Sequence, residues 1–276
     1  MLVDERRPGA KAFGRGLILR NLRAPEAGRD QRVDLALQGP RSLEILQALG
    51  TDAAASARLR ALPWAGVTEA VLSGFDLVVS RTGYTGERVA FELFVHPSKS
   101  VALWDALLKV GGGLGLKPVG LGARDSLRTE AGLPLYGNEM AGHHGLGVGH
   151  AGFASYVKTY KPWFVGREAF LHQEAARQSE VARFRFDEKG VRMAHGGDPV
   201  VDRRGRVMGF VTSCAVDRDG YLLGQACLER KAGLEGTPIG VFQGGYKPST
   251  AGPSGPSAGD RLSVPTPATV LPRFMR

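Results

Sequence analysis

A glutamate, Glu92, stands in the middle of the apolar segment AFELFV, whose composition is typical of a β-strand. Shortly before it, Tyr84 lies in a glycine-framed turn, Gly-Tyr-Thr-Gly. Burying a carboxylate is costly unless hydrogen-bond donors pair with it. Arg124 is one candidate partner, and a planar ligand with an amino group beside a ring N–H is another. Such a pterin-like or purine-like ring would also offer its face to Tyr84.

The alternative for Glu92 is a solvated position on an edge strand, and the alternation of residues leaves both interpretations open. Arg124 and Arg128 are four residues apart in a predicted helix over residues 122–131, so they share a face. Gly132 and Pro134 follow this helix and predict its end.

Two further motifs invite chemistry but lack its context. Residues 147–152, GVGHAG, match G-x-G-x-x-G, yet no strand precedes them, which indicates a glycine-rich loop rather than a dinucleotide site. The histidines His143, His144 and His150 lie in the same loop without zinc-ligand spacing, and the cysteines are distant in sequence. We therefore expect no metal site.

The composition restricts the partners. The net charge is +9 and the pI about 9.8, which favours an anionic small molecule or an acidic protein. The basic residues are scattered and accompany no nucleic-acid motif, so no nucleic-acid partner is expected. No apolar run is long enough for a membrane span. Two cysteines and no secretory signal at the N-terminus predict reduced thiols in a cytoplasmic protein.

The order of predicted elements divides the chain into four regions. Residues 1–32 form a basic irregular extension, and residues 33–178 form an α+β region with a strand at 33–37 and helices over 42–49 and from Pro97. Short strands alternating with turns predict a small β-domain over residues 179–245. Residues 246–276 are rich in Gly, Pro and Ser and predict a flexible tail, whose partly apolar end, VLPRFMR, is expected to pack back.

The segments SRTGYTGE, FELFVHP and GLKPVGLGARDSLRTEAGLPLYGNE resemble the glycine cleavage system T-protein family, the folate-dependent aminomethyltransferases. LALQGPRSLEIL, KPWFVGREAF and HGGDPVVDRRGRVMGFVTS fit the same pattern, so the resemblance runs from about Val33 to Phe242. It implies a ferredoxin-like, T-protein-type α+β region followed by a small C-terminal β-barrel domain.

The resemblance also implies an activity. The family transfers an aminomethyl group from the lipoyl arm of the acidic H-protein to tetrahydrofolate. The folate N5 attacks the methylene carbon, ammonia leaves and methylenetetrahydrofolate forms. Carried over to this sequence, Glu92 is the pterin-binding carboxylate, Arg124 is a folate-site residue and Tyr84 lines the same pocket.

The sequence departs from the family pattern in three places. The long N-terminal segment that carries the family's catalytic aspartate has no counterpart, so the catalytic residue is unknown and we expect the C-terminal portion of a T-protein-like enzyme, with another chain as a candidate to complete it. GERVAFE is one residue longer than the usual GEDGFE, which makes Glu87 an alternative to Glu92. HHGLGVGH replaces the usual sequence after YGNE, and Phe274 is the nearest aromatic residue to the family's C-terminal tyrosine.

The last of these departures leaves the carbon donor open. One alternative to aminomethyl transfer is therefore a folate-dependent demethylase that acts on an N-, S- or O-methyl substrate. The lack of a counterpart to the aspartate segment favours a second alternative, a non-catalytic folate-binding module.

Overall fold

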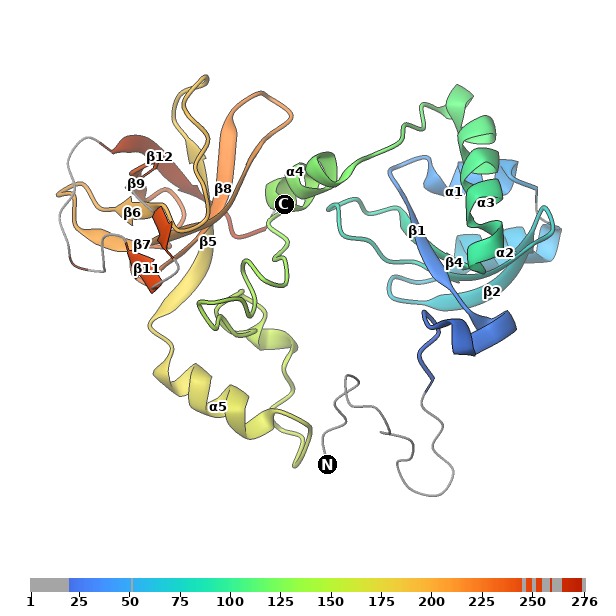
Figure 1. Ribbon diagram of the computed structural model, residues 1–276, viewed down its shortest axis with the longest axis horizontal. Coiled ribbons are helices and arrows are strands. Elements are labelled where there is room, and N and C mark those ends of the chain that lie inside the picture. The colour runs from blue at the N-terminus through green and yellow to red at the C-terminus, as the bar shows by residue number, and fades with distance from the viewer. Residues whose placement is uncertain are drawn as a thin grey trace. The chain divides into compact units, whose positions relative to one another are not determined.

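The structure is a computed structural model that describes residues 20–50, 52–244, 247–249, 252–254, 259 and 265–274. Most of the expected N-terminal extension, residues 1–19, lies outside these ranges. The chain forms two compact units, Met1–Val119 and Gly120–Arg276 (Figure 1). Among the described residues, no helix is both long and apolar enough to cross a membrane.

The first unit is a four-stranded antiparallel sheet with helices on one face. The strands are ordered β1-β4-β3-β2 across the sheet. A 3-10 helix, η1 (Pro25–Asp30), precedes the sheet, and η2 (Gly112–Leu114) follows the last helix. The strands are β1 (Val33–Gln38), β2 (Val67–Leu72), β3 (Phe75–Ser80) and β4 (Ala90–Val95), and the helices are α1 (Ser42–Ala48), α2 (Ala53–Ala61) and α3 (Pro97–Gly111).

Strand alternation explains which face of this sheet is covered. Phe91, Leu93 and Val95 of β4 are buried and pack in one core with leucines of all three helices. The residues between them, Glu92 and Phe94, point to the opposite face and are only half-buried. We call this opposite side the helix-free face of the first unit.

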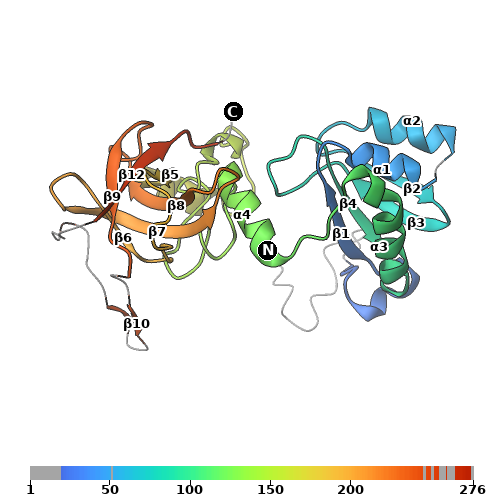
Figure 2. The ribbon, with the colours of Figure 1, turned by 90° about the horizontal axis from the view of Figure 1, so that it is seen from above.

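The second unit is a closed six-stranded barrel with helix α4 packed on strands β7 and β8. The order around the barrel is β12-β5-β8-β7-β6-β9 (Figure 2). A two-stranded hairpin, β10 with β11, lies outside the barrel sheet. The elements are α4 (Leu121–Ala131), η3 (Ala154–Tyr156), α5 (Arg167–Ala176), β5 (Ser179–Phe186), β6 (Pro199–Val201), β7 (Val207–Val216), β8 (Leu222–Glu229), β9 (Pro238–Val241), β10 (Lys247–Ser249), β11 (Gly252–Ser254) and β12 (Thr266–Leu271).

The mixed α+β architecture and the C-terminal barrel confirm the predicted fold class. The division into units differs from the predicted regions, because α4 belongs with the barrel on which it packs. Residues 266–271, which the sequence assigns to a flexible tail, form strand β12. This strand pairs with β5 and β9 and buries Ala268 and Val270, so the barrel closes through it.

Candidate functional site

Glu92 lies on an interior strand of the first sheet. Strand β4 is bonded to β1 on one side and to β3 on the other, with Glu92 opposite Ala36 and Ser80. The edge-strand alternative is therefore wrong. Because successive side chains of a strand point to opposite faces, the Glu92 side chain projects from the helix-free face. It is half-buried there, between Ala36 and Ser80 of the neighbouring strands. Such a carboxylate is partly shielded from water.

The segment GERVAFE runs from the loop before β4 into that strand. Both ladders of β4 are regular, without a bulge, from Ala90 onward. Residues 81–89, before the strand, have no regular secondary structure, so an additional residue there would leave the facing of β4 unchanged. Glu87 lies in this loop and is exposed. Glu92 therefore stands in the regular ladder of β4, and Glu87 stands outside it.

The turn that carries Tyr84 is tethered to the helix-free face by Gln38. The Gln38 Oε1 atom accepts hydrogen bonds from the Tyr84 backbone N–H, at 3.2 Å, and from the Thr85 hydroxyl, at 2.7 Å. Gln38 pairs with Ala90 in the ladder in which Ala36 pairs with Glu92, so Gln38 and Glu92 are on the same face. The structure therefore brings the Tyr84 turn and Glu92 to one side of one sheet.

Arg124 lies on α4 in the second unit, where its side chain is exposed. Its neighbour at four residues, Arg128, is only 1% exposed. The two arginines were expected to share a helix face. Their environments differ, because the barrel covers Arg128 and leaves Arg124 exposed. Arg124 remains accessible to a ligand, while Arg128 is engaged within the protein.

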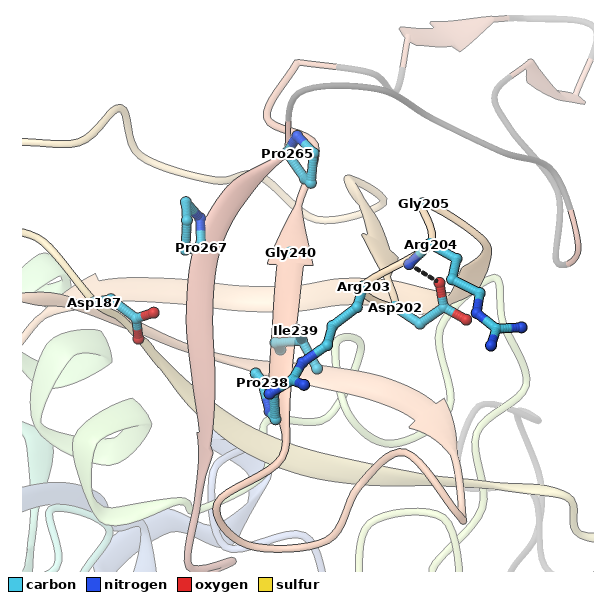
Figure 3. A pocket seen from close by; sticks show the side chains of 10 residues that line it. All are labelled: Asp187, Asp202, Arg203, Arg204, Gly205, Pro238, Ile239, Gly240, Pro265 and Pro267. Carbon is cyan, nitrogen blue, oxygen red and sulfur yellow. Dashed lines mark hydrogen bonds between the residues drawn. The ribbon is translucent and has the colours of Figure 1, made fainter.

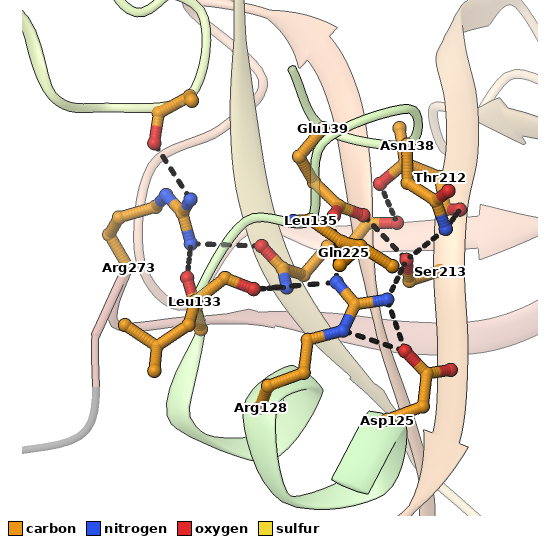
Figure 4. Close-up of polar contacts among 12 residues, drawn as sticks. Asp125, Arg128, Leu133, Leu135, Asn138, Glu139, Thr212, Ser213, Gln225 and Arg273 are labelled. Atoms are coloured by element: carbon orange, nitrogen blue, oxygen red, sulfur yellow. Dashed lines mark hydrogen bonds and ion pairs between the residues drawn. The ribbon is translucent and has the colours of Figure 1, made fainter. Parts of the chain in front are cut away.

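Arg128 is the centre of a buried polar network (Figure 4). Its Nη1 atom is 2.7 Å from Glu139 Oε2, and its Nη2 donates to Ser213 Oγ at 2.7 Å. The second Glu139 oxygen accepts from the Ser213 hydroxyl at 2.6 Å, and Asp125 bonds the guanidinium from the helix. The network links α4, the YGNE segment and strand β7. Its role in joining these elements was missed from the sequence, although Glu139 is the acidic residue of that motif.

The histidine loop shows no metal-ligating arrangement. The rings of His143 and His144 are 3.6 Å apart, and His144 stacks on Phe210 at 3.9 Å. His150 accepts a hydrogen bond from the Gly147 backbone N–H at 3.2 Å. Within the described ranges, no group of three or more His, Cys, Asp or Glu side chains is arranged to hold a metal ion. Residues 147–152 form turns rather than the start of a helix.

A cavity of about 380 Å³ lies on the barrel (Figure 3). Its walls are largely proline and backbone, with two arginines and two aspartates at the rim, and the Arg204 backbone N–H is bonded to Asp202. Arg124 does not line this cavity. The two aspartates that line it are engaged by Arg206 and Thr269, and we favour the helix-free face as the candidate site. The lining residues are Asp187, Asp202, Arg203, Arg204, Gly205, Pro238, Ile239, Gly240, Pro265 and Pro267.

Comparison with known proteins gives a consistent result. Residues 25–161 match the family model for the GCVT N-terminal domain. The aminomethyltransferase of Alkaliphilus metalliredigens (strain QYMF) is 40% identical over 182 residues, which cover 65% of this chain and 47% of the relative. That of Alkaliphilus oremlandii (strain OhILAs) is 37% identical over 222 residues, or 77% of this chain and 55% of the relative.

A solved structure supports the same relationship. The crystal structure of glycine cleavage system aminomethyltransferase T from Bartonella henselae matches with a TM-score of 0.67 and 25% identity, covering 88% of this chain and 59% of that one. The chain spans about half the length of the curated relatives. From the family model, the relatives and the shared fold, we conclude that the chain belongs to the glycine cleavage T-protein family.

Proposed function

We propose that this chain binds tetrahydrofolate and forms the folate-holding portion of an aminomethyltransferase. The observation that carries the proposal is the placement of Glu92 on an interior strand, half-buried on the helix-free face beside the Tyr84 turn. A pterin ring presents an amino group beside a ring N–H, and a carboxylate accepts both bonds at once. The alternation of β4 holds this carboxylate in a fixed direction.

The other residues have distinct roles in this proposal. Tyr84 lies against the pterin face. For Arg124, which is exposed on α4, the proposal keeps the folate-binding role that the resemblance implies. The net charge of +9 favours an acidic lipoyl carrier, the H-protein, as the donor of the aminomethyl group. The two cysteines are free thiols, which fits the cytoplasmic location expected from the sequence.

Tetrahydrofolate binding by isothermal calorimetry tests this proposal. Glu92→Gln keeps the size of the side chain but removes the charge, and we expect it to weaken binding about 10- to 100-fold. Glu87→Gln is the matched control, because it changes the same residue type in the exposed loop. A loss with Glu87→Gln and not with Glu92→Gln would move the carboxylate role to Glu87. Absence of binding by the unaltered chain would contradict the proposal.

A second assay separates binding from catalysis. The chain is mixed with aminomethyl-loaded H-protein and tetrahydrofolate, and ammonia release is measured. Binding without turnover, even with an added N-terminal T-protein fragment, would favour a non-catalytic folate-binding module. Turnover only with N-, S- or O-methyl compounds would identify a demethylase relative.

A further inference from the structure

We propose that Gln38 is a positioning residue that sets the location of the Tyr84 ring relative to Glu92. This inference rests on the proposed folate site and adds to it a residue that does not itself contact the ligand. Gln38 is the last residue of β1, and the Tyr84 turn lies 46 residues further along the chain. Two hydrogen bonds to one carboxamide oxygen connect them.

The Tyr84 turn needs hydrogen-bond partners from outside its own loop. The loop over residues 81–89 has no regular secondary structure, so its backbone donors need partners outside a ladder. Gln38 Oε1 has two lone pairs, and the Tyr84 N–H and the Thr85 hydroxyl occupy both. The bonded backbone N–H belongs to Tyr84 itself. Its ring therefore starts from an anchored Cα atom.

Gln38 is held in place by the ladder between β1 and β4. Gln38 lies in the ladder opposite Ala90, and the next residue, Gly39, donates its N–H to the carbonyl of Val89 at 3.0 Å. The ladder is therefore continued one residue beyond the strand end. Glu92 belongs to the same ladder, two residues along β4 from Ala90. One short piece of sheet thus determines where both the carboxylate and the turn lie.

The Gln38 carboxamide lies very close to the backbone of Gly83. A Cβ atom added to Gly83 would overlap the Oε1, Nε2 and Cδ atoms of Gln38. The first glycine of the Gly-Tyr-Thr-Gly turn therefore permits close approach of the Gln38 amide, and its backbone needs no left-handed conformation. Side chain and turn fit together only with glycine at this position.

Gln38 lies outside the hydrophobic core of the first unit. It faces away from the cluster formed by the sheet and helices α1 to α3, and its side chain is half-buried. Loss of its two bonds therefore releases the turn without opening the core. For a ring that stacks on a ligand, such release costs ordering on binding and lowers affinity more than stability.

The test replaces Gln38 by methionine, which has similar volume but no comparable acceptor. We expect Gln38→Met to weaken tetrahydrofolate binding about 10-fold, to leave the melting temperature nearly unchanged, and to speed amide hydrogen exchange over residues 82–86. Gln47→Met is the matched control, because Gln47 also makes a side-chain hydrogen bond, to Ser56, but joins α1 to α2. It should leave both the affinity and that exchange unchanged.

A double-mutant cycle distinguishes positioning from general disturbance. If Gln38 acts through Tyr84, Gln38→Met should add less than about 2-fold to the loss caused by Tyr84→Ala. Additive losses, or unchanged affinity and exchange in Gln38→Met, would overturn the inference while the folate site stands. Absence of binding by the unaltered chain would instead overturn the proposed function and with it the positioning for folate, even if exchange showed that Gln38 holds the turn.

Discussion

Arg128 and Glu139 form an ion pair with no access to solvent. Their Nη1 and Oε2 atoms are 2.7 Å apart, and the side chains are 1% and 0% exposed. Each charge has further partners, since Ser213 bonds both and the Leu135 backbone N–H donates to Glu139. A buried pair satisfied in this way couples α4 and the following loop to the barrel, and removal of one partner strands the other charge.

Arg128→Met should therefore destabilise the second unit by about 3–5 kcal/mol in the free energy of unfolding. Urea unfolding followed by circular dichroism measures this loss. Arg206→Met is the matched control, because Arg206 pairs with Glu229 at 2.8 Å but is 42% exposed. That change should cost much less, because water screens the pair. Equal midpoints for the two variants would show that the buried pair does not join the helix to the barrel.

The sequence predicts elements best where local signals agree. Helix α3 shows its apolar spacing and begins at Pro97. Helix α4 ends where Gly132 adopts a φ of 80°, a conformation that glycine tolerates. Helix α2 was not predicted, because only Ala55 and Leu59 in it are buried and the apolar pattern is weak. Strand β12 was not predicted, since two prolines and the surrounding composition hid its alternation.

The candidate site was predictable in its residue types but not in its geometry. The resemblance points to Tyr84, Glu92 and Arg124, and the apolar context alone marks Glu92 as unusual. Whether β4 was interior or at an edge depends on pairing with β1 and β3, and spacing along the chain does not determine this. The tether from Gln38 spans 46 residues and depends on the same register. The geometry of the candidate site therefore depends on pairing between strands that are distant in the sequence, which local residue patterns do not predict.

Substitution of Gly83 provides a steric test of the same turn. In Gly83→Ala, the added methyl group meets the far end of a flexible side chain, so the Gln38 amide should swing away and break its two bonds. We expect a loss of tetrahydrofolate affinity of about 10-fold with little change in melting temperature. In a Gln38→Met background the same substitution should add little. A large further loss there would mean that the backbone of the turn, rather than the carboxamide, rejects the methyl group.

The cysteines should react slowly in the folded protein. Burial raises the pKa of the Cys214 thiol to about 11, and burial also raises the pKa of Cys227. Because the thiolate is the nucleophile, little of either side chain is reactive at pH 8. Iodoacetamide labelling followed by mass spectrometry should show slow modification in buffer and rapid modification of both residues in urea. Rapid labelling of the folded chain would contradict the shielding of Cys227, which is buried, and of Cys214, which is half-buried.

The stability of the second unit should decrease as the pH falls below about 6.5, with His150 as one cause. Burial lowers the pKa of His150, and the nearby Arg177 guanidinium lowers this pKa further, against the opposing effects of Glu174 and Glu180. The Gly147 N–H donates to His150 Nδ1, a bond that only the unprotonated nitrogen accepts. Between the folded and unfolded pKa values, the unfolded chain binds more protons, so the free energy of unfolding increases with pH.

His150→Gln should flatten this dependence, because glutamine does not titrate. Urea unfolding at intervals between pH 7.5 and pH 5 measures the slope for both proteins. His96→Gln is a suitable control, since His96 lies in the first unit, caps α3 from an accessible position and accepts from the Ser98 N–H at 3.2 Å. His96→Gln should leave the pH dependence of the unfolding of the second unit unchanged. If His150→Gln retained the full slope of the unaltered second unit, another group, and not His150, would control its sensitivity to acid.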